Sequence, residues 1–207
     1  MGLISDGTTI FDAGAMASGF GGSMTFIKKL TASSSGTVNF VDGSSGVVLD
    51  NTYKEYMFTF KNIHPSANAY FSFQGNAAGG SGFDETITST FFYAYLKETN
   101  SDPTLMYNTG SDQAQATGYQ RIAADGTNTD ADGNIGGYLR LFNPSSTTFV
   151  KHFEGRMSNS NGTGDDTYSC DCFTAGYFNT TSAIDEISFK FSSGNIDAGD
   201  ICLYGIS

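Results

Sequence analysis

Acidic and amide residues cluster in the segment "DGTNTDADGN", and their spacing suggests a calcium-binding loop. Asn128, Asp130 and Asp132 fit the opening of a D-x-[DN]-x-[DN]-G motif, whose side-chain oxygens would coordinate the ion. The complete motif also needs a Glu six residues after its glycine, and Leu139 stands at that position, which excludes an EF-hand. A non-standard calcium site formed by Asp125, Asp130 and Asp132 stays open, beside the simpler interpretation of a Gly- and Asp-rich hairpin loop.

The residues that nucleophilic or acid–base catalysis would need are sparse. The two histidines are His64, which precedes a proline and is predicted in a turn, and His152, which is predicted on the surface of a strand. No G-x-S-x-G elbow, phosphate-binding loop or dinucleotide-binding glycine motif is present. The adjacent carboxylates Asp165 and Asp166 lie in "SNSNGTGDDTYS", which is typical of a solvated loop and not of a hydrolase cleft. We therefore expect a protein that is not an enzyme.

The cysteines Cys170, Cys172 and Cys202 are odd in number, so they cannot all form disulfides within one chain. Cys170 and Cys172 would lie on the same side of one strand, where a disulfide between them has poor geometry. A disulfide from either one to the strand of Cys202 stays open, but we expect free thiols. A structural zinc site needs about four ligands at close spacing, which a C-x-C pair and two distant histidines do not supply. Apart from the calcium alternative, the sequence predicts no metal and no cofactor.

The charge and hydropathy of the chain exclude two classes of partner. Ten basic residues stand against 21 acidic ones, which gives a net charge of −11 and repels the phosphate backbone of nucleic acid. No apolar run approaches the roughly 18 residues that a membrane span requires, and the first residues lack the pattern of a secretory signal peptide. We therefore expect neither a nucleic-acid partner nor a membrane partner.

Short alternating runs predict the elements that carry these residues. Runs such as "KEYMFTFKNI", "GYLRLFN" and "IDEISFKF" alternate apolar and polar side chains between Gly- and Asp-rich turns, and no convincing amphipathic helix is present. About ten such runs are typical of an all-β sandwich or barrel. We predict a single antiparallel β-sandwich over residues 23–207, preceded by an extended arm over residues 1–22. The closing segment "DICLYGIS" is predicted to be a sheet strand and not a tail.

One predicted strand, "STFFYAYLKE", is apolar on both of its sides. One alternating set is Phe91, Tyr93 and Tyr95, and the other is Phe92, Ala94 and Leu96. A strand of this kind is either internal to the fold or covered on its outer face by another subunit. The sequence leaves both interpretations open.

Several segments resemble small virion structural proteins of marine tailed bacteriophages, notably those that infect cyanobacteria. The resemblance rests on "LISDGTTIFDAGA", "LDNTYKEYMFTFKNIHPS", "LRLFNPSSTTFVKHFEG" and "AGYFNTTSAIDEISFKFSSGNIDAGDICLYGIS", and it extends from Leu3 to Ile206. It implies a β-sandwich of the jelly-roll type, assembled in the bacterial cytoplasm and displayed on the virion exterior as a trimer or another homo-oligomer. It implies no cofactor and no catalytic residue.

The sequence and the resemblance together favour a non-enzymatic virion structural protein, either a tail-fibre or appendage component or a capsid decoration protein. In this interpretation Leu3–Ile10 would anchor the chain to other virion proteins by adding a strand to an exposed sheet edge. In a tail position, the loops 124–137 and 158–167 would contact the receptor. The alternative is a carbohydrate-binding, lectin-like module for receptor recognition, whose partner would be a host-surface glycan and whose support is an all-β fold with polar loops. A depolymerase would need a cluster of carboxylates that the sequence does not reveal.

Overall fold

Strands account for all the regular secondary structure in the computed structural model of the chain, which describes residues 1–207 except 1–2, 6–7, 13–14, 17–22, 125 and 162–166. The strands are β1 (Leu3–Ser5), β2 (Thr8–Asp12), β3 (Ala15–Met16), β4 (Met24–Ser35), β5 (Val38–Val41), β6 (Glu55–Pro65), β7 (Phe71–Ala77), β8 (Ile87–Lys97), β9 (Thr104–Tyr107), β10 (Ala114–Ala116), β11 (Gln120–Arg121), β12 (Ile135–Phe142), β13 (Lys151–Asn161), β14 (Tyr168–Phe178), β15 (Ile184–Phe191) and β16 (Ile196–Ile206).

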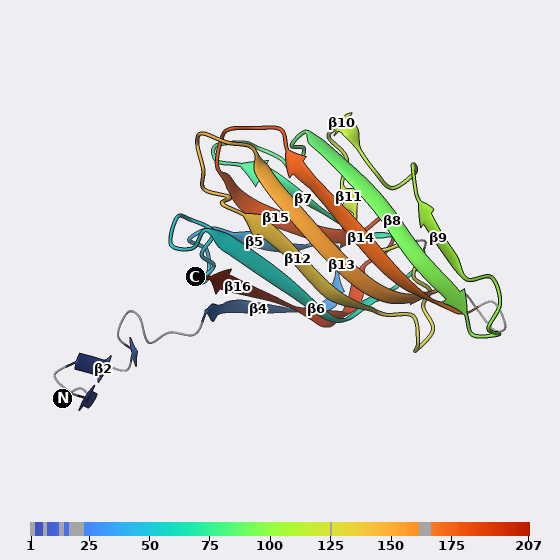
Figure 1. Cartoon of the computed structure of the whole chain (residues 1–207), viewed down its shortest axis with the longest axis horizontal. Helices are drawn as coiled ribbons and strands as arrows, with labels where there is room; N and C mark the ends of the chain where they lie inside the picture. Colours follow the sequence, from blue (N-terminus) through green and yellow to red (C-terminus); the bar gives the residue numbers. More distant parts are fainter. Residues whose placement is uncertain (1–2, 6–7, 13–14, 17–22, 125, 162–166) are drawn as a thin grey trace.

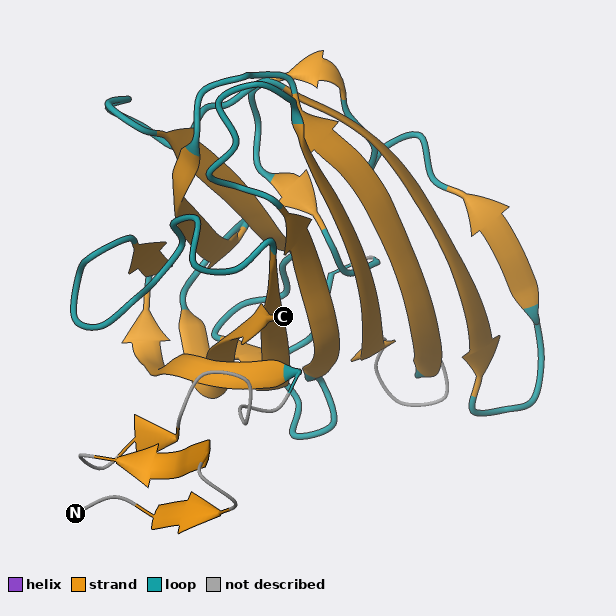
Figure 2. Ribbon diagram, turned by 60° about the vertical axis from the view of Figure 1, so that its left-hand side comes forward, coloured by secondary structure: helices purple, strands orange, loops and turns teal. Residues whose placement is uncertain are grey.

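Two antiparallel sheets form the sandwich that the sequence predicts (Figure 1). The larger sheet has nine strands in the order β10-β8-β14-β13-β12-β6-β16-β4, with β9 paired to β8 at one edge. The smaller sheet has four strands in the order β11-β7-β15-β5. Figure 2 shows the long strands of the large sheet side by side, with loops joining them at both ends. The all-β prediction is confirmed, whereas the jelly-roll assignment stays a prediction.

The N-terminal strands β1, β2 and β3 pair with one another as a small antiparallel sheet and, within the described part of the chain, with no other strand. The predicted arm over residues 1–22 falls partly on residues 1–2, 6–7, 13–14 and 17–22, which lie outside the described residues. The arm, its boundary with the sandwich and the anchoring role of Leu3–Ile10 therefore stay predictions.

Period-two alternation places the core between the two sheets. In the first half of β6, Tyr56, Phe58 and Phe60 are buried, with partly exposed residues between them. Alternate residues of a strand point to opposite faces, so these three rings all enter the space between the sheets. The closing segment also behaves as predicted, because β16 pairs with β6 on one side and with β4 on the other.

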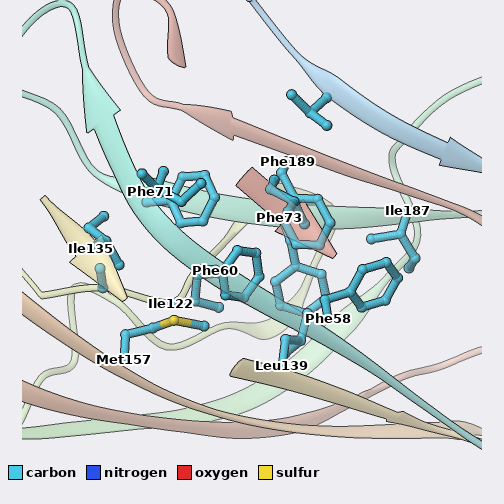
Figure 3. Close-up of a cluster of buried hydrophobic side chains, with 14 of the residues drawn as sticks. Phe58, Phe60, Phe71, Phe73, Ile122, Ile135, Leu139, Met157, Ile187 and Phe189 are labelled. Atoms are coloured by element: carbon cyan, nitrogen blue, oxygen red, sulfur yellow. The ribbon is translucent and has the colours of Figure 1, made fainter. Parts of the chain in front are cut away.

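Phe189 of β15 lies at the centre of this core (Figure 3). Its ring contacts Phe58 and Phe60 of the large sheet at centroid distances of 5.2 Å each, in edge-to-face geometry. It also contacts Phe71 and Phe73 on the adjacent strand β7. Aromatic pairs of this kind contribute roughly 0.5–1.5 kcal/mol each beyond the burial of their surface. Phe189 therefore joins the two sheets directly.

His64 lies in strand β6 and not in the turn that its neighbouring proline suggested. Its Nε2 is 3.2 Å from the backbone oxygen of Asp130, and its Nδ1 is 3.6 Å from a carboxylate oxygen of Asp197. The prediction of a turn was wrong because a strand tolerates a proline where its pairing is interrupted by a bulge. The register of β6 against β16 shifts near this point. His152 lies on the exposed side of β13, as predicted.

Replacing Phe189 with alanine is expected to destabilise the fold by about 3–5 kcal/mol, because the substitution leaves a cavity among rings from both sheets. Urea unfolding monitored by circular dichroism measures this change. The matched control is Phe149→Ala, since Phe149 is 70% exposed and its loss should change the free energy of unfolding by less than about 0.5 kcal/mol. Equal effects of the two substitutions would contradict the position assigned to Phe189.

Candidate functional site

The outer face of β8 exposes apolar side chains that the sandwich itself does not cover. Phe91 is fully buried and Tyr93 is 5% exposed, whereas Phe92 is 40% exposed and Leu96 is 43% exposed. β8 pairs with β14 on one side and with β9 and β10 on the other, so its backbone is internal to the sheet. Its outer face nevertheless lies open within the part of the chain that the structure describes. β8 is therefore an internal strand of the sheet, as one of the two interpretations predicts, and cover of its outer face by another subunit stays a prediction.

A row of aromatic residues and one arginine crosses five strands on this face. The strand register pairs Tyr107 with Phe92, Phe92 with Phe173, Phe173 with Arg156, and Arg156 with Tyr138. Directly opposed residues of antiparallel strands lie on the same side of the sheet, so the five form one continuous line. We call these five residues the aromatic row.

The centre of the aromatic row is held by stacking and by an ion pair. The rings of Phe92 and Phe173 stack with centroids 4.9 Å apart and planes at 6°, and the Cζ of Arg156 lies 4.9 Å from the Phe173 centroid. Arg156 donates two hydrogen bonds to Asp171, of 2.8 and 2.7 Å, which raise the pKa of the guanidinium. A bidentate arrangement fixes the plane of the guanidinium beside the rings.

Three shallow hollows lie along the same face. The first, of about 440 Å³, is lined by the rings of Phe142, His152 and Tyr177 together with Thr88 and Glu154. The second, of about 270 Å³, shares Glu154 with the first and adjoins the aromatic row. The third, of about 470 Å³, lies on the other side of the row, next to Ser158 and Ser169. The row thus separates hollows whose walls combine aromatic and polar groups.

A charged network adjoins the first two hollows through Glu154, which lines both of them. Arg140 donates to Glu55 at 2.6 Å and to Glu154 at 2.8 Å, and the hydrogen bond to Glu55 is the main reason why the pKa of Arg140 is raised. Glu154 remains 45% exposed at its side chain. The network therefore offers an oriented carboxylate to a ligand, and its two carboxylates outnumber its one guanidinium.

The predicted calcium residues are only partly described. Asp125 lies outside the described residues, while Asp130 and Asp132 are exposed in the loop between β11 and β12. Asp130 is held locally by hydrogen bonds with the side chain of Asn128. Among the described residues, no three His, Cys, Asp or Glu side chains lie close enough together to hold a metal ion. The site formed by Asp125, Asp130 and Asp132 stays a prediction.

The two loops predicted to contact a receptor differ from the expectation. Residues 158–161 belong to strand β13, and residues 162–166, with the predicted pair Asp165 and Asp166, lie outside the described residues. In the loop 124–137, the residues Ala124, Thr127 and Asn128 are buried, and β12 begins at Ile135. The described parts of both loops therefore contain more strand and more buried residues than their Gly- and Asp-rich composition predicts.

All three cysteines are buried free thiols. Cys170 and Cys172 lie on the inner side of β14, as their spacing predicts, and Cys172 receives a hydrogen bond from the backbone N–H of Ala124 at 3.1 Å. The neighbouring Cys170 and the burial of the site raise the pKa of the Cys172 thiol. A thiol in this environment remains protonated and packs as a small apolar side chain.

Comparison with known proteins yields no match to any family model, curated protein or solved structure. Among the described residues, no helix is long and apolar enough to cross a membrane.

The cysteines are expected to resist thiol reagents in the native protein, because the three side chains are at most 6% exposed and the pKa of Cys172 is raised. Labelling with a chromogenic disulfide reagent at pH 8 should proceed only at the rate of unfolding, and all three thiols should react at once in denaturant. Rapid labelling of the native protein would contradict the free, buried state of these residues.

Proposed function

We propose that this chain is a non-enzymatic structural protein displayed on the exterior of a tailed-phage particle, where copies of it associate through the outer face of the large sheet. The observation that carries the proposal is an apolar strip formed by the exposed side chains of Phe92, Leu96, Leu105 and Tyr107 and the half-buried ring of Phe173. Contiguous exposed apolar surface of this kind is typical of protein–protein contact sites.

The strip lies where one sheet edge meets the outer face. Leu105 is 74% exposed and Tyr107 is 49% exposed on the short strand β9, which pairs with β8 only. Leu105 stands opposite Ala94, and Tyr107 stands opposite Phe92, so both face outward beside the aromatic row. Covering this surface with a second copy would bury these apolar side chains. Each Å² of apolar area removed from water would stabilise the assembly by about 25 cal/mol.

Symmetric association supports a role on a particle that contains many identical chains. The sequence resemblance to phage virion proteins points in the same direction, and the net charge of −11 favours a surface that remains soluble and does not bind nucleic acid. A trimeric appendage and a capsid decoration protein both use a contact of this kind. The N-terminal residues would then connect the assembly to other virion proteins.

Replacing Leu105 with glutamate is expected to convert the homo-oligomer to a monomer, because the carboxylate would be desolvated within the contact. Multi-angle light scattering of the purified chain measures the native mass. The control is Thr181→Glu, which adds the same charge at an exposed position on another part of the surface and should leave the mass unchanged. An unmodified chain that is monomeric at all concentrations would refute the proposed self-association.

A carbohydrate-binding role is a second candidate, and the first hollow favours it. Its Tyr177 and His152 rings lie 5.7 Å apart, and the exposed carboxylate of Glu154 stands beside them. Sugar rings present C–H groups to aromatic side chains and hydroxyl donors to carboxylates. The excess of carboxylates over guanidinium around Arg140 disfavours an anionic glycan and is compatible with a neutral one.

Tyr177→Ala is expected to abolish binding of the chain to neutral oligosaccharides on a glycan array, because the substitution removes a ring that lines the first hollow. Tyr53→Ala, at a partly buried tyrosine that packs on Tyr56, serves as the control for loss of a tyrosine elsewhere. Absence of any hit for the unmodified chain, presented multivalently, would exclude this second candidate and leave the structural proposal untouched.

A further inference from the structure

A second surface, on the outer face of the small sheet, concentrates positive charge in an otherwise acidic protein. The arginines of the chain are Arg121, Arg140 and Arg156. Arg140 and Arg156 form ion pairs with carboxylates, whereas Arg121 forms none among the described residues. Lys190 likewise forms no ion pair with any described carboxylate. These two cations are therefore available to an external anion.

The strand register brings Arg121 and Lys190 to the two sides of one serine. Strand β7 lies between β11 and β15 (Figure 1), and its Ser72 pairs with Arg121 on one side and with Lys190 on the other. Opposed residues on antiparallel strands share a face, and two strand spacings separate the backbones of the two cations by about 10 Å. The side chains of Arg121 and Lys190 are long enough to contact the same ligand group, bound above Ser72.

Two tyrosines hold these cations in position. The Cζ of Arg121 lies 3.7 Å from the centroid of the Tyr70 ring, and the Nζ of Lys190 lies 4.0 Å from the centroid of the Tyr119 ring. Tyr119 is itself fixed, because its hydroxyl donates to the Oγ of Ser188 at 3.1 Å. Cation–π contacts orient a charged group without neutralising it, in contrast to an ion pair.

The same residues line a hollow of about 390 Å³ on the surface. Among the described residues, no carboxylate belongs to its lining, which is completed by Gly118 and the hydroxyls of Ser72 and Ser192. The Oγ of Ser192 accepts a hydrogen bond from the backbone N–H of Tyr70 at 3.0 Å, so its own hydroxyl proton can be donated to a ligand. The nearest acidic residue along β15 is Glu186, which accepts a hydrogen bond from Asn76.

We propose that this hollow binds a single carboxylate carried by an otherwise neutral, hydroxyl-rich molecule, such as an acidic sugar. Arg121 and Lys190 would donate charge-assisted hydrogen bonds to the carboxylate, with Ser192 as a third donor. The oxygens of Tyr119 and Ser192 would accept hydrogen bonds from neighbouring hydroxyls of the ligand.

The overall charge of the protein restricts the ligand further. A net charge of −11 repels a densely charged polyanion at long range, whereas a ligand with one negative charge meets mainly the local field of the two cations. The site lies on the small sheet, away from the aromatic row on the large sheet, so it is independent of the function proposed above.

The test compares three probes that separate the carboxylate from the sugar ring: glucuronate, acetate and glucose. Each is titrated into the full-length, isotope-labelled chain while the backbone amide signals of Ser72, Arg121 and Lys190 are followed by NMR. Glucuronate should cause saturable shifts at these positions, and it should bind more tightly than acetate because the ring hydroxyls add contacts. Glucose should cause no shift there.

Arg121→Gln and Lys190→Gln should each weaken glucuronate binding by about tenfold, since each removes one charge-assisted contact. Lys54→Gln is the control, because it removes the same charge from an exposed lysine outside the hollow. Comparable thermal unfolding of all variants establishes that the fold is retained. Absence of shifts with glucuronate, equal affinity for acetate, or an equal loss in the Lys54 variant would overturn the proposal.

Discussion

The contact between phenylalanines of the two sheets is the interaction on which the rest of this structure depends. Phe189 touches Phe58 and Phe60 across the sandwich, and Phe71 stacks against it from within the small sheet. Because these rings occupy the inner face, the alternating positions of the same strands must point outward. The inner packing therefore determines which residues the protein presents to its surroundings, on both of its outer faces.

The two outer faces differ in chemistry because their strands differ in outward residues. On the large sheet, the outward positions of β8, β14 and β13 bring Phe92, Phe173 and Arg156 into one row, and the arginine is neutralised by Asp171. On the small sheet, the outward positions include Arg121 and Lys190, which face tyrosine rings and no carboxylate among the described residues. An apolar, charge-balanced face suits contact with protein, whereas a small cationic face suits an anionic ligand.

Local alternation in the sequence is sufficient to predict part of this arrangement. The pattern of Tyr56, Phe58 and Phe60 identifies a half-buried strand, and the two-sided pattern around Phe92 indicates an outer face that is unusually apolar. The row from Tyr107 to Tyr138 is not predictable in this way, because it is created by pairing between strands that are distant in the sequence. The convergence of Arg121 and Lys190 depends in the same way on strand register. His64 is wrongly predicted in a turn because the adjacent proline is visible in the local sequence, whereas the pairing of β6 with β16 is not.

The proposed display on a tailed-phage particle is tested most directly by immunogold electron microscopy of intact particles from phage lysates that contain this chain, with antibodies raised against the purified protein. A structural protein displayed on the exterior predicts regular labelling of intact particles, confined to the capsid surface or to the tail appendages. Labelling that appears only after the particles are disrupted, or that is absent from them, would contradict the account.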